Sequence, residues 1–179
     1  MGVLELIPEL DEALASVPHA FGGAIALAYC TGQPRGTIDV DLNIFVSTDR
    51  ADEILGLLRP VVRATPAQTS ALSKDGQARL RTSSTPVDVF LSYSDLHAVA
   101  ERRVRRVEFQ GRSIPVLDCT DLAVFKAMFD RTKDWADIIE ALRAGTINLR
   151  RLRSWITRLT AADDPRHVRL DAAISEAGR

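Results

Sequence analysis

The 179-residue sequence has two cysteines, few aromatic residues and no uninterrupted apolar run of the roughly 18 residues that a membrane-spanning helix needs. Cys30 and Cys119 form no CxxC pair and have no histidine cluster nearby, so we expect two buried thiols rather than a disulfide or a zinc site. The acidic start lacks the basic region of a secretory signal, which favours a cytoplasmic location and no membrane partner. Without a P-loop, a GxGxxG or a Ser-His-Asp order, the P-loop ATPase, dehydrogenase and hydrolase classes are not expected.

The charges that are present are distributed unevenly along the chain. Residues 1–96 carry 7 Lys+Arg and 12 Asp+Glu, whereas residues 97–158 carry 13 and 8. An acidic half is suited to holding cations and a basic half to meeting phosphates, although such charges also commonly just solvate helix surfaces.

The hydrophobic pattern predicts an α+β core over residues 1–118 and a helical C-terminal part over residues 119–179. Strands are expected at 37–46, 77–82 and 86–92, with a hairpin formed by 107–110 and 113–117 around Gly111. Helices are expected at 3–16, 24–32, 52–58, 95–104, 120–130, 134–144, 148–159 and 165–176. Asp121, Asp134 and Asn148 are placed to begin three of these helices.

Three carboxylates lie where expected strands would expose them. Asp39 and Asp41 are two residues apart, so in a strand they would share one face and repel each other unless a cation lay between them. Asp88 stands between two valines in a strand whose interior is otherwise apolar, where an acid is expected to be paired or functional. Carboxylate oxygens at this spacing suit Mg²⁺. The sequence therefore predicts a magnesium site on Asp39, Asp41 and Asp88, in the outline of a two-metal phosphoryl-transfer centre.

Residues just before these carboxylates are suited to phosphate binding. Gly22 and Gly23 precede a helix whose first backbone N–H groups would meet phosphate oxygens. Arg35 and Thr37 add a cation and a hydroxyl, although both are also ordinary residues for a turn and a strand.

The strings Phe21-Gly22-Gly23 and Arg35-Gly36-Thr37-Ile38-Asp39-Val40-Asp41-Leu42 resemble the signature of the DNA polymerase β-like nucleotidyltransferase superfamily. The gap between the two strings is similar to that of the AbiEii-type branch. A later string, with Lys126, Arg131 and Lys133-Asp134-Trp135-Ala136-Asp137, is similar to the second motif of that branch.

This resemblance implies a mixed-sheet nucleotidyltransferase core and a role for each matching residue. Asp39 and Asp41 would bind Mg²⁺, and Asp88 would complete the metal site and activate the acceptor hydroxyl. Lys126 would hold the triphosphate of an NTP donor. Arg131 or Lys133 would assist Lys126, and Asp134 and Asp137 would shape the nucleotide pocket or orient Lys126.

The resemblance also implies a biological role. The branch includes bacterial toxins of toxin–antitoxin systems, among them mycobacterial members that add pyrimidine nucleotides to the 3′ end of tRNA. By this resemblance the chain would block aminoacylation and translation, and a cognate antitoxin protein would restrain it.

Other interpretations of these residues stay open. Asp88 is placed to pair with Arg79 or Arg81 on the neighbouring strand, Lys126 to extend from an apolar helix face, and Asp134 to cap a helix. Trp135 and Trp155 are expected in the core. A protein or aminoglycoside hydroxyl is an alternative acceptor, and a catalytically silent nucleotide-binding or partner-binding protein is an alternative function.

Two arginine-rich strings are candidates for RNA binding. In a helix, Arg102 and Arg106 would share one face, as would Arg150 and Arg153. A face of this kind can bind the phosphates of a nucleic-acid backbone. A solvated helix face or a docking site for an acidic antitoxin would have the same composition. The candidate RNA-binding residues are Arg102, Arg103, Arg105, Arg106, Arg150 and Arg153.

Overall fold

The computed structural model describes residues 2–179 and divides the chain into two units. The first unit consists of the residues up to Ile25 together with Arg35–Leu117, and it contains a mixed six-stranded sheet. The second consists of Ala26–Pro34 and Asp118–Arg179, and its regular elements are helices. The predicted α+β class is confirmed.

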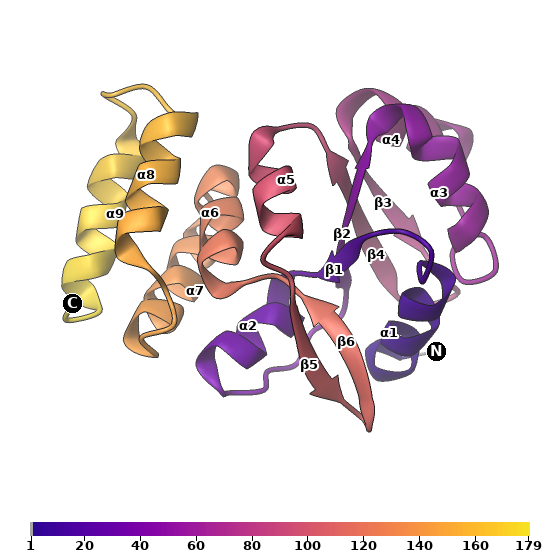
Figure 1. The fold of residues 1–179 in the computed structure, drawn as a ribbon, viewed down its shortest axis with the longest axis horizontal. Helices are drawn as coiled ribbons and strands as arrows, with labels where there is room; N and C mark the ends of the chain where they lie inside the picture. The colour runs from indigo at the N-terminus through magenta and orange to yellow at the C-terminus, as the bar shows by residue number, and fades with distance from the viewer. Residues whose placement is uncertain (1) are drawn as a thin grey trace. The chain divides into compact units, whose positions relative to one another are not determined.

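The strand order across the sheet is β3-β4-β2-β1-β6-β5 (Figure 1). Strand β2 is parallel to β4 and β1 is parallel to β6, whereas the other neighbours are antiparallel. The predicted hairpin is confirmed, with Gln110 and Gly111 both at positive φ in its two-residue turn. The strand bounds are β1 His19–Phe21, β2 Val40–Ser47, β3 Gln77–Arg81, β4 Pro86–Ser92, β5 Arg105–Phe109 and β6 Arg112–Val116.

Side chains along β2 and β4 alternate between the buried core and the face that carries the candidate site. Val40 and Val87 are register partners and fully buried, and the next pair of partners, Asp41 and Asp88, is partly exposed on the opposite face. Arg79 of β3 is in turn the register partner of Asp88. Three charged residues therefore form one row across β3, β4 and β2.

Helices lie on both sides of this sheet. Helix α5 contacts β2, whereas α4 contacts β3 and β4 and packs beside α3, which also contacts α1 (Figure 1). Helix α4 has a reciprocal N-terminal cap between Thr65 and Gln68, and it ends at Gly76 in the left-handed region. The bounds are α1 Val3–Ala13, α2 Gly23–Thr31, the short 3₁₀ helix η1 Thr48–Arg50, α3 Ala51–Leu58, α4 Pro66–Asp75 and α5 Asp95–Glu101.

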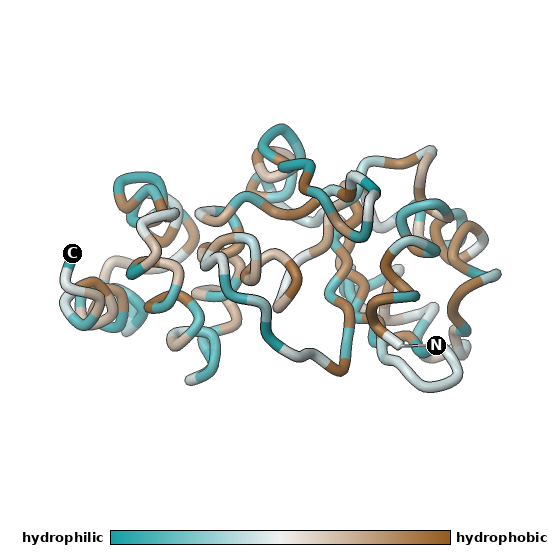
Figure 2. Tube along the Cα trace, turned by 90° about the horizontal axis from the view of Figure 1, so that it is seen from below, coloured by the Kyte–Doolittle hydropathy of each residue, from teal (hydrophilic) through white to brown (hydrophobic). Residues whose placement is uncertain are grey.

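The second unit consists of four helices and the end of α2. Helices α8 and α9 are amphipathic, and hydrophobic and hydrophilic residues alternate along the turns that lead to the C-terminus in Figure 2. Trp135 and Trp155 are mostly buried, as predicted. The bounds are α6 Cys119–Phe129, α7 Thr132–Arg143, α8 Leu149–Leu159 and α9 Pro165–Glu176. Within the described residues, 2–179, no helix has the length and apolar character that crossing a membrane requires.

Several expected boundaries are wrong. The first helix ends at Ala13, not near residue 16, and α5 ends at Glu101. Because the chain then turns and enters β5, Arg102 and Arg106 do not share a helix face. Strand β1 and helix α4 were not expected at all. Asn148 caps α8 as predicted, whereas α6 is capped by Asp118 rather than begun by Asp121.

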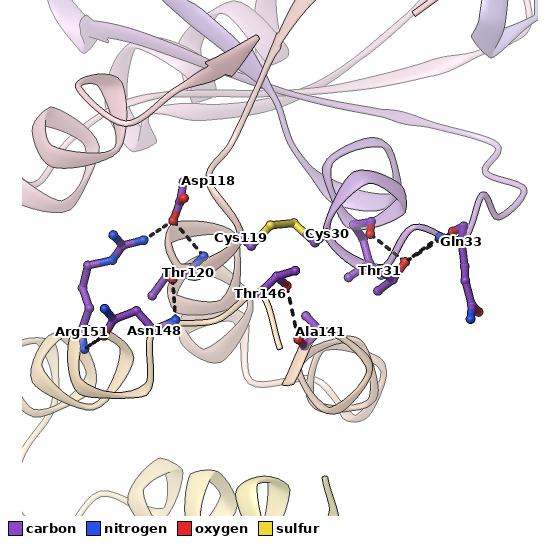
Figure 3. Close-up of a disulfide and its surroundings, with 11 residues drawn as sticks. Cys30, Thr31, Gln33, Asp118, Cys119, Thr120, Ala141, Thr146, Asn148 and Arg151 are labelled. Atoms are coloured by element: carbon purple, nitrogen blue, oxygen red, sulfur yellow. Dashed lines mark hydrogen bonds and ion pairs between the residues drawn. A yellow bond between two sulfur atoms is a disulfide. The ribbon is translucent and has the colours of Figure 1, made fainter. Parts of the chain in front are cut away.

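The expectation of two free thiols is also wrong. Cys30 in α2 and Cys119 at the start of α6 form a disulfide across 89 residues of sequence, with a Cα–Cα distance of 5.5 Å (Figure 3). Both cysteines are almost completely buried within the second unit. Sequence spacing could not indicate this pairing, because the contact between the two helices forms only in the tertiary structure.

Candidate active site

The glycine pair at the end of β1 brings the backbone against Asp41. The Gly22 N–H donates to the Asp41 carbonyl oxygen at 2.9 Å. Gly23 has a φ of +51°, and a Cβ placed there would lie 1.8 Å from Oδ2 of Asp41. A Cβ on Gly22 would lie 2.8 Å from Nδ2 of the buried Asn43. Only glycine allows this approach, which places the first turn of α2 beside the Asp41 carboxylate.

Arg79 joins the other two carboxylates. Its guanidinium lies 2.9 Å from Oδ2 of Asp88 and 3.2 Å from Oδ2 of Asp39. Asp39 lies one residue before β2, so the strand begins at Val40 rather than at residue 37 as expected. The Thr37 hydroxyl, 2.9 Å from Oδ1 of Asp39, and Arg79 hold this carboxylate. The structure thus brings Asp39 and Asp88 to one positive group, next to the register partner Asp41.

The chemistry of this cluster fits a divalent cation. In the part of the chain that the structure describes, no three His, Cys, Asp or Glu side chains are already arranged as a metal-binding group. Asp39 and Asp88 nevertheless converge on one cation, the Arg79 guanidinium, which stands in for a positive ion between them. Carboxylate oxygens are the ligands that Mg²⁺ prefers, so Asp39, Asp41 and Asp88 are the residues that would hold it.

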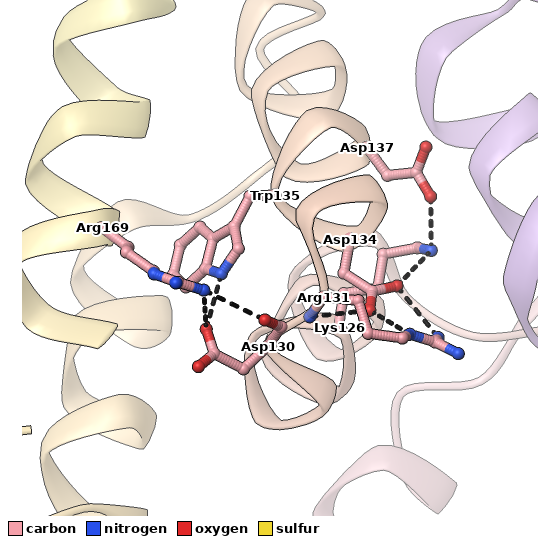
Figure 4. A network of polar contacts seen from close by, with 7 residues as sticks. All are labelled: Lys126, Asp130, Arg131, Asp134, Trp135, Asp137 and Arg169. Carbon is pink, nitrogen blue, oxygen red and sulfur yellow. Dashed lines mark hydrogen bonds and ion pairs between the residues drawn. The ribbon is translucent and has the colours of Figure 1, made fainter. Parts of the chain in front are cut away.

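A second charged cluster surrounds Lys126 in the second unit (Figure 4). The Lys126 ammonium lies 2.6 Å from Oδ2 of Asp137 and 3.5 Å from Oδ1 of Asp134. All three side chains are nearly or completely buried, with Asp134 at 0% exposure. The guanidinium of Arg131 donates to both oxygens of Asp134, at 2.6 and 3.2 Å. The alternative, that Lys126 only extends from an apolar helix face, does not fit, because two acids fix the direction of its ammonium.

The ionisation of Asp134 supports this arrangement. Burial opposes the charged form of Asp134, but the hydrogen bonds from Arg131 and the charge of Lys126 outweigh it and lower the pKa of this carboxyl. Asp134 also accepts from the Arg131 backbone N–H at 3.3 Å, so it caps α7 as well. The capping and orienting roles expected for Asp134 are compatible.

Comparison with known proteins rests on structure. No family model matches the sequence, and no curated protein does. Two structures of the antibiotic-resistance factor ANT(2″)-Ia match with a TM-score of 0.56, at 16% and 17% identity, over 96% of this chain and 89% and 97% of theirs. An antigenic nucleotidyltransferase-like protein from Paracoccidioides brasiliensis matches with a TM-score of 0.51 at 17% identity, over 96% of this chain and 94% of its own. The fold is that of a nucleotidyltransferase.

Within this nucleotidyltransferase fold, two contacts near the carboxylates were not expected. The pairing of Asp88 with Arg79 is confirmed, but Arg79 also contacts Asp39. The side chain of Asn43 lies against Gly22. The strands that carry Arg79 and Asp88 were both predicted, so their antiparallel register was the signal available for Arg79. The AbiEii-type resemblance stays a prediction.

The remaining predicted residues are dispersed over the nucleotidyltransferase fold. Arg35 and Lys133 are exposed. Arg106 of β5 donates to the Ser113 side chain and carbonyl oxygen, at 3.2 and 2.9 Å. Arg150 and Arg153 share the exposed face of α8, as predicted, and Arg153 pairs with Asp171 at 2.7 Å. The first-unit group of basic residues is Arg102, Arg103, Arg105 and Arg106.

Proposed function

We propose that this chain is a Mg²⁺-dependent nucleotidyltransferase that moves a nucleoside monophosphate from an NTP to an acceptor hydroxyl. The observation that carries the proposal is the row formed by Asp88, Asp41 and the glycine turn. It combines carboxylates suited to a divalent cation with a helix N-terminus suited to phosphate oxygens, and a metal-bound polyphosphate can use both. The nucleotidyltransferase fold of the structural neighbours is consistent with this activity.

The chain's own residues account for binding, orientation and proton transfer. The Gly22 N–H is held by the Asp41 carbonyl oxygen, so the backbone N–H groups in the first turn of α2, from Gly23 on, would bind phosphate oxygens. In the role that the resemblance implies, Lys126, directed by Asp137, would bind the triphosphate. Asp88 would accept the proton of the acceptor hydroxyl at Oδ2, and the acceptor oxygen would bond to the α-phosphorus. The bond between the α-phosphorus and the oxygen that bridges it to the β-phosphorus would break, and pyrophosphate would leave with that oxygen and the electron pair. Magnesium supplies neutralisation of the phosphate charge when it is bound. Positioning and charge neutralisation, more than a strong base, provide the rate enhancement.

For the acceptor, we propose the 3′ end of tRNA and a pyrimidine nucleotide as the donor. The resemblance to AbiEii-type toxins supports this choice, as do the exposed arginines Arg150 and Arg153 on one face of α8. In this proposal the chain is a cytoplasmic toxin that blocks aminoacylation, and a cognate antitoxin restrains it.

An aminoglycoside hydroxyl is the second candidate acceptor. The observation that favours it is the similarity to ANT(2″)-Ia, one structure of which is a complex with adenylyl-2″-tobramycin. The exposed basic face of α8 gives no advantage for a cationic aminoglycoside, so we place this acceptor second.

The test uses purified full-length protein with Mg²⁺ and each labelled NTP in turn, in the presence of total tRNA, tobramycin or a protein extract. We expect label on tRNA 3′ ends with CTP or UTP preferred. Asp41→Asn should abolish transfer, because it removes a carboxylate beside the glycine turn. Asp75→Asn, the same change at an exposed acid at the end of α4, should leave transfer intact.

The outcomes separate the candidates. Label on tobramycin or on protein, but not on RNA, would retain the enzyme and overturn the acceptor. No transfer to any acceptor, with NTP still bound, would leave the catalytically silent nucleotide-binding protein as the correct interpretation.

A further inference from the structure

Arg79 is positioned between the two carboxylates that the proposed reaction needs unpaired. Its guanidinium lies 2.9 Å from Oδ2 of Asp88. Asp88 is the proposed proton acceptor, and Oδ2 is the atom that would take the proton. The second guanidinium nitrogen contacts Asp39 at 3.2 Å. While these contacts last, Oδ2 of Asp88 accepts from an arginine, which keeps it from an acceptor hydroxyl.

The Arg79 side chain has room to leave this position without disturbing the sheet. Its backbone is fixed in β3, where Arg79 is the register partner of Asp88 and its carbonyl oxygen accepts from the Gln68 side chain. The side chain, in contrast, is 48% exposed, while those of Asp39 and Asp88 are 28% and 20% exposed. Ion pairs of this exposure are individually weak, so a divalent cation has sufficient charge to replace them.

We propose that Arg79 is an internal counter-ion that competes with the divalent cation for Asp39 and Asp88. In the absence of the cation, the guanidinium neutralises carboxylates whose mutual repulsion would otherwise destabilise this edge of the sheet. A bound cation displaces Arg79 into solvent and releases Oδ2 of Asp88 for its role in the reaction. Arg79 is thus a positioning residue that sets how much cation the protein requires, and this inference rests on the proposed function.

The test measures cation binding directly, by calorimetry with Mn²⁺ and by the relaxation of water protons around bound Mn²⁺. Arg79→Gln removes the competing charge, and Arg81→Gln makes the same charge change two residues along the same strand. Because two weak ion pairs are lost, we expect Arg79→Gln to bind Mn²⁺ about three- to tenfold more tightly than the unchanged protein. Arg81→Gln should bind Mn²⁺ as tightly as the unchanged protein does. Arg79→Lys keeps a single point charge, so its affinity for Mn²⁺ should lie between those of the unchanged protein and Arg79→Gln.

A thermal measurement provides a second readout. Without metal, Arg79→Gln should melt at a lower temperature than the unchanged protein, and added Mn²⁺ should narrow this difference. In the transfer assay, the same variant should reach half of its maximal rate at a lower Mg²⁺ concentration.

Equal or weaker Mn²⁺ binding by Arg79→Gln would overturn the inference about Arg79. If the unchanged protein still transferred nucleotide in that case, the proposed function would stand. If neither protein bound Mn²⁺ and neither transferred nucleotide to any acceptor, the proposed function would fail together with the inference.

Discussion

The disulfide should contribute a large part of the stability of this protein. Cys30 and Cys119 are 89 residues apart, and the chain-entropy relation for a loop of this length gives about 4.6 kcal/mol at 25 °C. Domains of this size are typically stable by about 5–15 kcal/mol, so reduction should remove between about a third and nearly all of the free energy of unfolding. Both sulfurs are buried, so reduction should be slow in the folded state and fast in denaturant.

The assay is urea unfolding of the oxidised and the fully reduced protein, followed by the fluorescence of the buried Trp135 and Trp155. We expect the free energy of unfolding to fall by about 4–5 kcal/mol on reduction. The double variant Cys30→Ala, Cys119→Ala should be equally unstable with and without reductant. Thiol titration in denaturant should detect none before reduction and two after it. Two reactive thiols in freshly purified protein, or a difference below about 1 kcal/mol, would refute the reasoning, given the loop-length estimate.

Two further predictions concern the first unit. Gly23→Ala should lower the free energy of unfolding by roughly 1–2 kcal/mol, because residue 23 has a φ of +51°. Its Cβ would also displace the Asp41 carboxylate, so the variant should transfer nucleotide at least about 100-fold more slowly in the labelled-NTP assay. Burial lowers the pKa of His97 from 6.5 to about 4, so the unfolded state takes up a proton first as the pH falls. The stability that neutral His97 contributes should therefore be present at pH 7 and decrease by about 3 kcal/mol towards pH 4, as urea unfolding at several pH values would measure.

Each of these predictions has a matched control. Gly32→Ala places a Cβ at a φ of +68° with no atom within 4 Å, so it should lose similar stability but retain transfer. Equal activity losses in Gly23→Ala and Gly32→Ala would contradict the proposed contact with Asp41. His97→Phe should remove most of the pH dependence between pH 7 and pH 4, and an unchanged pH profile in this variant would assign the effect to other groups.

Strong periodicity made most of the fold predictable from the sequence, and the omissions have physical reasons. Strand β1 has only three residues, too few to show alternation. Helix α4 buries Leu72 but presents little other apolar surface, so its pattern is weak. Its end signals were nevertheless present in the sequence, because Thr65 and Gln68 form a capping box and Gly76 ends the helix.

The candidate site was predictable in its residue types and in one contact, the pairing of Asp88 with Arg79, but not in the contacts of Asp39. Asp41 was identified from its two-residue spacing to Asp39, and Asp88 because an acid is unusual in an apolar strand, and the structure places the two in register. The position of Asp39 depends on a bend before β2, and the role of Arg79 depends on the register between β3 and β4. Both are tertiary properties that local pattern does not encode. The same is true of the helix contact that brings Cys30 to Cys119.

The register of β4 has a consequence for how this sequence can vary. Val87, Asp88 and Val89 alternate between the buried face and the face of the candidate site, so one inserted or deleted residue within β4 would exchange the two sets. A carboxylate would enter the core and a valine would replace it opposite Asp41. Natural variants of this chain should therefore differ in length in the turn at residues 82–85, before β4, and keep an even spacing within the strand itself.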